Sequence, residues 1–269
     1  MVSGSLQKIL ERKSFTPSLE NSLQGEEIIV FSDTHLGMKR GSNAEDFRRF
    51  LSYLRDEVER RPTTIVVNGD FVELWTRDDF TVLVENIPVI EQLYNLAKKN
   101  KVYWIIGNHD YRFKDFTSHL LPICVRRQLI LRDGDSSYRF VHGDQYDPTQ
   151  IEFFYPLLCE RSDEISGEFL SRLGGRLLST VRKVYPRLNR QFKEGKWEML
   201  KIPEERGIKG IVEENAKKDR REGEFLIFSH THQAFVNEEE KLANPGCWVK
   251  EHPNTYLRVK NRRIELEEF

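Results

Sequence analysis

Five short apolar runs occur along the chain, and polar residues of the metal-binding or catalytic kind follow each of them closely. An apolar run of this length with polar flanks is typical of a buried β-strand. The runs are Ile28–Phe31, Thr64–Val67, Val102–Ile106, Tyr138–Val141 and Phe225–Ser229. Side chains two positions apart on an extended chain point the same way, so Asp33 and His35 can face one point. We therefore expect a group of polar side chains at the ends of these strands.

Two helical patterns separate the first three runs. From about Ala44 to Arg60 the apolar residues recur at helical spacing, and Pro62 ends the pattern. A second helix is predicted from about Val89 to Lys99. Strands that alternate with helices indicate parallel βαβ units.

The second half of the chain shows antiparallel patterns instead. Gln128–Leu131 and Tyr138–Val141 flank the turn sequence Asp133-Gly134-Asp135, which is a hairpin signal. Three further short strands are predicted at Cys247–Lys250, Thr255–Val259 and Arg262–Glu267. Together the patterns predict an α/β (α+β) fold, a four-layer αββα sandwich of two mixed β-sheets flanked by helices.

Residues 148–222 interrupt this scheme and are predicted to form a helical insertion, or lid. Its apolar residues follow helical spacing at Leu170, Leu173, Leu177, Val181, Val184 and Leu188. Between residues 171 and 201 nine basic side chains stand against two acidic ones, which suits either a solvated face or a binding surface. We assign residues 1–25 to an N-terminal extension and 26–269 to one domain that the insertion interrupts.

Composition narrows the possible functions. The 42 basic and 43 acidic residues give a net charge near −1, so the chain as a whole exerts no electrostatic pull on nucleic acid. The three cysteines lie far apart without a CxxC pair, which argues against a thiolate zinc site and favours a reducing compartment. With no apolar run near the ~20 residues of a membrane span and no apolar leader, we expect a cytoplasmic protein.

The polar residues after the strands are a mixed set of carboxylates, imidazoles and one amide. The candidates are Asp33, His35, Asp70, Asn108, His142, His230 and His232. In sheets of α/β type the carboxyl ends of the strands form the crevice where ligands bind. Mixed nitrogen and oxygen donors suit borderline divalent ions, whereas calcium prefers oxygen alone. Seven donors are too many for one ion, so we expect two ions that share a carboxylate.

These motifs, in this order, resemble those of the calcineurin-like metallophosphoesterases. The series is Asp-x-His, Gly-Asp, Gly-Asn-His-Asp, His-Gly-Asp and His-Thr-His, and the resemblance covers most of residues 27–250. It implies a first ion held by Asp33, His35 and His232 and a second held by Asn108, His142 and His230, with Asp70 bridging them. Manganese is the expected ion, with iron, zinc, cobalt or nickel as alternatives.

The resemblance also implies the chemistry. A hydroxide that bridges the two ions would attack phosphorus in line and hydrolyse a phosphate ester or anhydride. His109 would lie beside the leaving group as general acid, with Asp110 orienting it. The chain departs from the family at Ser229, where Gly is usual, and at Glu73, where many relatives carry Asp.

The substrate is indicated by a branch of the family. The phrase His142-Gly143-Asp144-x-x-Asp147, the helical insertion and the turn Asn244-Pro245-Gly246-x-Trp248 resemble the UDP-2,3-diacylglucosamine hydrolases. Those enzymes cleave a pyrophosphate in a lipid precursor and hold its acyl chains under a helical lid. The resemblance implies a phosphorylated, nucleotide-linked or lipid-like substrate under the lid 148–222, with peripheral membrane contact there. Known members of this branch carry Arg where this chain has His109.

Two other functions fit the same sequence. A nuclease or nucleotide phosphodiesterase would use the same ligands, and basic residues interleaved with Tyr185, Phe192 and Trp197 could grip a strand. A non-catalytic binding scaffold would show lost ligands, and none is lost. Among the remaining polar residues, Asp144 is either a loop carboxylate or a support for a metal ligand. Loop or surface positions are expected for Glu73, Trp75, His119, Asp147 and His252.

Overall fold

The structure, a computed structural model, describes residues 19–23, 26–38, 41–74, 77–115, 122–147 and 207–269. Most of the expected insertion, including its predicted helical stripe, lies outside these residues, as do Trp75, His119 and the first part of the N-terminal extension. No helix among the described residues is both long and apolar enough to cross a bilayer.

One six-stranded sheet, sheet B, contains the first three predicted strands. Its order is β12-β11-β2-β3-β4-β5. Four strands run parallel: β2 (Glu27–Phe31), β3 (Thr63–Asn68), β4 (Lys101–Ile105) and β5 (Ile123–Arg126). Two strands join antiparallel: β11 (Thr255–Lys260) and β12 (Arg263–Glu268). The parallel units and the C-terminal hairpin predicted from the sequence therefore meet in one mixed sheet.

The second sheet, sheet A, has the order β1-β6-β7-β8-β10-β9. Its strands are β1 (Leu19–Ser22), β6 (Gln128–Asp133), β7 (Ser136–Val141), β8 (Glu224–Ile227), β10 (Leu242–Asn244) and β9 (Phe235–Asn237). The hairpin predicted around Gly134 is the β6–β7 pair. Strand β1 pairs in parallel with β6, so four residues of the expected N-terminal extension belong to the sheet.

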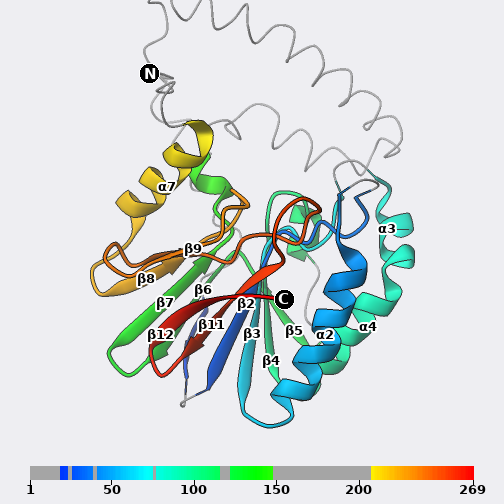
Figure 1. The fold of residues 1–269 in the computed structure, drawn as a ribbon, viewed down its shortest axis with the longest axis horizontal. Coiled ribbons are helices and arrows are strands. Elements are labelled where there is room, and N and C mark those ends of the chain that lie inside the picture. Colours follow the sequence, from blue (N-terminus) through cyan, green and yellow to red (C-terminus); the bar gives the residue numbers. More distant parts are fainter. Residues whose placement is uncertain (1–18, 24–25, 39–40, 75–76, 116–121, 148–206) are drawn as a thin grey trace, which may run out of the picture.

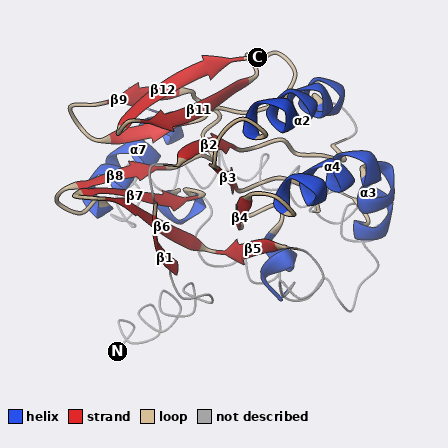
Figure 2. Ribbon diagram, turned by 90° about the horizontal axis from the view of Figure 1, so that it is seen from below, coloured by secondary structure: helices blue, strands red, loops and turns tan. Residues whose placement is uncertain are grey.

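Helices cover the outer faces of both sheets (Figures 1 and 2). The helices α2 (Ala44–Val58), α3 (Asp79–Glu85) and α4 (Ile87–Ala97) lie beside sheet B, and α7 (Gly207–Asp219) lies beside sheet A. The short turns η1 (Tyr111–Asp115) and η2 (Asp144–Tyr146) follow β4 and β7. The four-layer αββα sandwich predicted from the sequence is confirmed.

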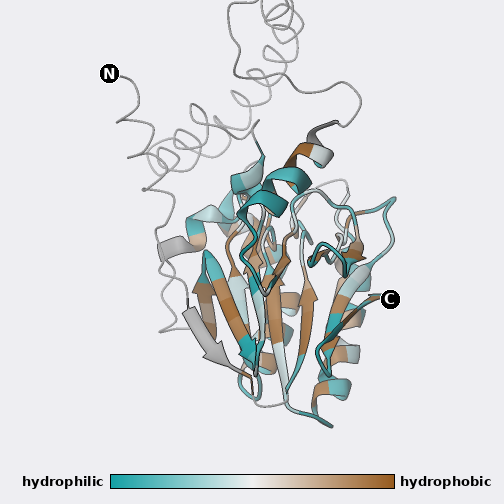
Figure 3. Ribbon diagram, turned by 90° about the vertical axis from the view of Figure 1, so that its left-hand side faces the viewer, coloured by the Kyte–Doolittle hydropathy of each residue, from teal (hydrophilic) through white to brown (hydrophobic). Residues whose placement is uncertain are grey.

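Strand β2 shows why the layers form. Ile29 and Phe31 pack towards the helices in one core, whereas Ile28 and Val30 pack between the two sheets in another. Alternate side chains of a strand point to opposite faces, so a continuous apolar run is buried on both sides. A third core lies under α7 around Val212. Figure 3 shows the same pattern as hydrophobic strands within a more hydrophilic exterior.

The structure adds one helix that was not predicted and corrects one predicted strand. Helix α3 was not expected, and it begins with the Asp78 side chain accepting a hydrogen bond from the Thr81 backbone N–H. The predicted strand Cys247–Lys250 is instead a loop with isolated bridges at Cys247 and Val249. The reason is long-range packing, because fully buried Trp248 lies 4.6 Å from Phe50, centroid to centroid.

Candidate metal centre

The carboxyl ends of five strands bring all seven predicted ligands to one edge of the sandwich. Loops after β2, β3 and β4 of sheet B carry Asp33, His35, Asp70 and Asn108. Loops after β7 and β8 of sheet A carry His142, His230 and His232. Three groups of side chains have ligand atoms within 4.8 Å of one another: Asp33, His35 and His232; His35, Asp70 and His109; and Asp70, His142 and His230.

The backbone at these positions is unusual. Five of the seven residues have positive φ: Asp33 (50°), His35 (43°), Asp70 (51°), His230 (69°) and His232 (59°). Such conformations cost of order 1–3 kcal/mol each for residues other than glycine, and they cluster at functional sites. Backbone hydrogen bonds between the loops hold them, for example from Asp33 N–H to Gly69 O at 3.0 Å and from His35 N–H to Asp70 O at 3.0 Å.

Two glycines permit the close approach of the ligands. Gly69 has φ of 92°, and a Cβ there would lie 2.2 Å from His142 Nδ1. A Cβ at Gly107 would lie 2.1 Å from an Asp70 carboxylate oxygen. Neither distance is tolerable, so both motif glycines are needed for the site to close.

The first cluster consists of Asp33, His35 and His232. The His232 Nε2 atom lies 3.2 Å from Asp33 Oδ1 and 3.2 Å from His35 Nε2, and His35 Nε2 lies 3.9 Å from the same carboxylate oxygen. Two imidazole nitrogens and one carboxylate oxygen thus converge. Within the described part of the chain, buried Asp33 Oδ1 accepts no hydrogen bond. This donor set fits a borderline divalent cation.

The second cluster is centred on His142. Its Nε2 atom lies 3.1 Å from Asp70 Oδ2 and 3.0 Å from Asn108 Oδ1, while its Nδ1 atom lies 3.1 Å from the Asn68 carbonyl oxygen. In the neutral form of His142, an Nδ1–H donated to that carbonyl would leave the lone pair of Nε2 available to a cation. Asp70 Oδ2 is also 3.9 Å from His35 Nε2, so Asp70 lies between the two clusters.

In the metal-free centre, the carboxylates and imidazoles stabilise one another's charged forms. Burial favours neutral Asp33 and Asp70, but the nearby imidazoles outweigh it and hold both pKa values below the ordinary range, Asp70 most strongly. Burial likewise opposes protonation of His142 and His232, but Asp70 and Asp33 raise each pKa to about 10. Without metal the centre is therefore a set of carboxylate–imidazolium pairs, and an incoming cation must displace protons.

Comparison with known proteins identifies the family of this chain. A family model described as calcineurin-like phosphoesterase matches residues 27–234, more than half of the chain. The chain belongs to the calcineurin-like phosphoesterase family. It is therefore a phosphoester hydrolase of a metal-dependent family, as the sequence predicted.

Relatives agree with this assignment. Proteins named UDP-2,3-diacylglucosamine hydrolase from Coxiella burnetii strains RSA 331 and RSA 493 are each 26% identical over 258 residues, covering 90% of this chain and 97% of theirs. The structure of a novel archaeal phosphodiesterase is 15% identical, covering 90% of this chain and 99% of that one, with a TM-score of 0.41.

Glu73 contacts the predicted catalytic residue of this phosphoesterase. Its carboxylate Oε2 lies 2.7 Å from His109 Nδ1 and 3.4 Å from His35 Nδ1. Burial favours the neutral carboxyl, but the two imidazoles lower the Glu73 pKa to about 2. Burial also opposes protonation of His109, yet Asp70 and Glu73 raise its pKa. Glu73 lies in the loop after β3, as expected, but it is buried against two histidines, a position that its local sequence did not indicate.

Asp110 has a different position from the one expected. Its oxygens accept hydrogen bonds from Gly107 N–H (2.6 Å), Phe71 N–H (2.9 Å) and Trp104 Nε1–H (2.9 Å). Burial and the charge of Asp70 raise the Asp110 pKa to about 6. Asp110 therefore fixes the Gly-Asn-His-Asp loop, while Glu73 supplies the carboxylate beside the His109 imidazole.

Asp147 was also expected to be a loop carboxylate, but it is buried beside a ligand. Its Oδ2 atom lies 2.9 Å from His230 Nε2. Asp144, also buried, pairs with Arg127, and its charge contributes to the raised pKa of His142. Of the two roles considered for Asp144, this buried position favours support of a metal ligand, which stays a prediction. His252 is exposed, as expected.

The departure at Ser229 has a structural explanation. Its hydroxyl accepts a hydrogen bond of 2.7 Å from Asn68 Nδ2, which links the end of β3 to the loop after β8. The turn at Asn244 lies beside the same loop, because Asn244 Nδ2 donates to Ser229 O (3.3 Å) and Thr231 Oγ1 (3.0 Å). Glycine at 229 could not make the first of these contacts.

Proposed function

We propose that this phosphoesterase binds two divalent cations, with manganese the expected ion, and hydrolyses a nucleotide-linked pyrophosphate or a related phosphate ester. The observation that carries the proposal is the position of Asp70 between two clusters of donor atoms. The relatives' name, UDP-2,3-diacylglucosamine hydrolase, supports a nucleotide-linked lipid as the substrate class. We also propose that the part of the predicted insertion before α7 covers the substrate, because α7 itself packs against sheet A.

Two bound cations would supply an activated water near neutral pH and positive charge beside the phosphoryl oxygens. The chain's own residues supply positioning and a proton. Asp70 Oδ1 accepts a hydrogen bond of 2.9 Å from the His109 backbone N–H, so the bridging carboxylate and the acid are fixed together. The phosphorus would lie above the two clusters, within reach of His109.

His109 is placed to protonate the leaving oxygen. Its Nδ1 atom faces Glu73 at 2.7 Å, which leaves Nε2 for the substrate. The side chain is 22% exposed, whereas Asp33, His35, Asp70 and His142 expose 3% or less. The raised pKa keeps the imidazolium form available near neutral pH, which is what a general acid requires.

The first experiment measures turnover of bis-p-nitrophenyl phosphate and p-nitrophenyl phosphate with and without manganese. We expect manganese-dependent turnover in the wild type, a loss of at least about a thousandfold in Asp70→Ala, and a drop in bound metal from two ions per chain. Asp56→Ala, which changes an exposed aspartate on α2, is the matched control and should behave as the wild type.

The outcomes separate the alternatives. Bound metal without turnover of either compound would direct the assay to UDP-2,3-diacylglucosamine itself. A wild type that binds no metal and hydrolyses none of these compounds would support the binding scaffold and reject the hydrolase. Turnover that survives Asp70→Ala would reject the bridging position of Asp70.

A further inference from the structure

The chain crosses from sheet B to sheet A at Arg127. This residue is the single position between β5, which ends at Arg126, and β6, which begins at Gln128. Strand β5 lies at one end of sheet B, and β6 lies between β1 and β7 in sheet A. Figure 2 shows β5 and β6 following one another where the two sheets meet. Because a strand holds the backbone on each side of Arg127, its side chain has a defined position relative to both sheets.

The Arg127 guanidinium contacts two chain segments that carry ligands of the second cluster. Its Nη1–H donates to the carbonyl oxygen of Ile106 at 2.5 Å, two residues before Asn108. Its Nη2–H donates to the carboxylate of Asp144, two residues after His142. Asn108 Oδ1 and His142 Nε2 themselves lie 3.0 Å apart. The guanidinium therefore bridges the segments whose side chains must meet at one cation.

Burial and charge make this bridge strong and directional. The side chain of Asp144 is 4% exposed and that of Arg127 is 14% exposed. Burial opposes the ionised form of Asp144, but the charge of Arg127 lowers its pKa, so the pair is ionised. A guanidinium is planar and carries its donors in a rigid fork, so two contacts fix its orientation as well as a distance. A lysine ammonium in the same place would compensate the charge without fixing that orientation.

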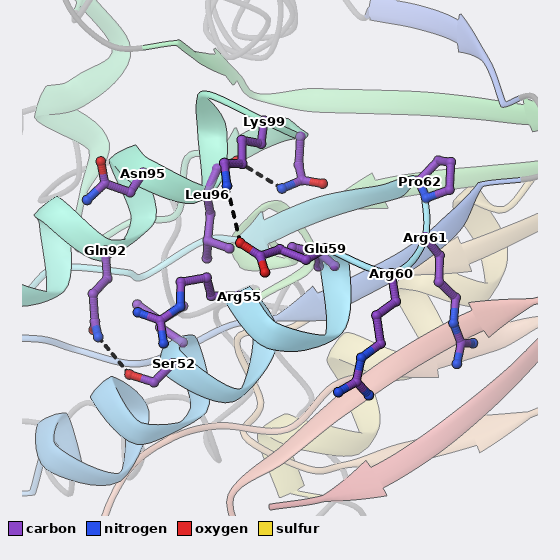
Figure 4. Close-up of a pocket in the computed structure, with 13 residues that line it drawn as sticks. Ser52, Arg55, Glu59, Arg60, Arg61, Pro62, Gln92, Asn95, Leu96 and Lys99 are labelled. Carbon is purple, nitrogen blue, oxygen red and sulfur yellow. Dashed lines mark hydrogen bonds and ion pairs between the residues drawn. The ribbon is translucent and has the colours of Figure 1, made fainter.

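Arginines beside the pocket between α2 and α4 show the contrast (Figure 4). The side chains of Arg55 and Arg60 are 60% and 72% exposed, and they pair with Asp56 and Glu57, which are close neighbours in sequence. Exposed pairs of this kind contribute little to stability and hold no distant segments together. Arg127 instead contacts residues 17 positions after it and 21 positions before it.

We propose that Arg127 is a positioning residue for the second cation. By holding the loops after β4 and β7 together, it keeps Asn108 and His142 at coordinating distance from one ion. This inference rests on the proposed function, because it concerns one of the two proposed cations. The first cluster lies outside this bridge, since its three ligands come from the loops after β2 and β8. Loss of Arg127 should therefore weaken the second cation site and spare the first.

The test measures manganese binding to the full chain and the electron paramagnetic resonance spectrum of the bound ions. Two Mn²⁺ ions about 3.5–4 Å apart should give an exchange-coupled spectrum, which differs from that of an isolated ion. In Arg127→Gln we expect the Kd of one ion to rise by about 10- to 100-fold, and the coupled spectrum to give way to that of an isolated ion. Arg126→Gln is the matched control, because the Arg126 guanidinium contacts Val125 O of its own strand at 2.7 Å. It should bind both ions as the wild type does.

Combined variants identify which ion is affected. Asn108→Ala should weaken the same ion as Arg127→Gln, and adding the second change to the first should raise its Kd by less than about threefold further, because both act on one cluster. His232→Ala combined with Arg127→Gln should weaken the remaining ion as well. Arg127→Lys keeps a positive charge beside Asp144 but not the fork, so it should fold and still raise the Kd of the second ion by about tenfold.

Each outcome supports or overturns the positioning role. Unchanged affinity for both ions in Arg127→Gln, equal weakening of both, or wild-type affinity in Arg127→Lys would reject it. If Arg127→Gln does not fold, Arg127→Lys decides. A wild type that binds fewer than two ions would reject the proposed function instead, and crystal structures of the metal-free wild type and Arg127→Lys would then judge the bridge alone. A longer distance between Asn108 Oδ1 and His142 Nε2 in the variant would support it, and an unchanged distance would reject it.

Discussion

The two sheets contribute chemically different halves of the metal centre. Loops of sheet B supply two carboxylates, an amide and one imidazole: Asp33, Asp70, Asn108 and His35. Loops of sheet A supply imidazoles alone: His142, His230 and His232. Backbone N–H groups hold the carboxylates, as His109 N–H does for Asp70, whereas carbonyls and carboxylates hold the imidazoles. Both carboxylates of the candidate centre therefore come from one sheet, and three of its four imidazoles come from the other.

Removal of the predicted acid should separate catalysis from metal binding within the sheet B half. His109→Ala deletes a proton donor but no assigned ligand, so we expect a loss of about 100- to 10,000-fold in kcat with two ions still bound. The measurement pairs kcat for bis-p-nitrophenyl phosphate with metal content by elemental analysis. An intact rate would exclude His109 as general acid, and lost metal would make it a ligand.

Two buried carboxylates allow a matched test of the halves. Glu73→Gln acts on His109 and His35 in sheet B, and Asp147→Asn acts on His230 in sheet A. Loss of such a supporting carboxylate typically lowers metal affinity or activity by about 10- to 100-fold. We expect excess manganese to restore kcat in Asp147→Asn but not in Glu73→Gln.

The Glu73 variant has a second signature in its pH profile. Glu73 raises the pKa of His109, and a general acid acts only while protonated, so activity falls as pH rises through that pKa. In Glu73→Gln the alkaline limb of kcat should move to lower pH. An unmoved limb, or equal rescue of both variants by manganese, would show that the two carboxylates are interchangeable supports.

Glu73 and Asp147 also show which parts of the site could not be predicted from the sequence. The seven predicted ligands follow apolar runs in a specific order, so local sequence patterns identify them. Their convergence could be predicted because the carboxyl ends of the strands meet at one edge of the sandwich. Glu73 and Asp147 carry no such signal, because their roles depend on histidines distant in sequence; Asp147 and His230 are 83 positions apart. The loop at Trp248 was missed for the same reason, since its conformation follows from packing against α2. Local patterns predicted the strands and ligands, and only the assembled sandwich shows what supports them.

When metal is absent, the stability contributed by the sheet A histidines is lost at high pH, and the stability contributed by the sheet B aspartates is lost at low pH. His142 and His232 have pKa values raised to about 10, so the stability they confer is complete below their ordinary value near 6.5 and is lost as pH rises through about 10. Asp33 and Asp70 have lowered pKa values, so their contribution is present above about 3.8 and is lost as pH falls through the folded values. In the presence of a chelator, the urea concentration at the midpoint of unfolding should therefore decline at both acidic and alkaline pH.

Bound metal should counteract the loss of protein stability at alkaline pH. Binding displaces protons from the imidazoles, so manganese affinity should rise with pH between about 6.5 and 10. Calorimetry in buffers of different ionisation enthalpy would measure the proton release directly. An affinity independent of pH would show that the imidazoles are already neutral in the metal-free protein.

The smallest expected effect concerns the contact that joins the two halves. Ser229→Ala removes the acceptor for Asn68 Nδ2, which keeps its other hydrogen bond of 2.9 Å to Val141 O. A buried donor left without a partner costs about 1–3 kcal/mol, so thermal unfolding should occur a few degrees lower, while kcat changes by less than about threefold. Ser229→Gly restores the usual family residue and adds freedom to the unfolded chain, so it should be destabilised slightly more than the alanine variant. If either variant lost as much activity as Asp147→Asn, the Asn68–Ser229 hydrogen bond would have to position His230 as well as hold the sheets together.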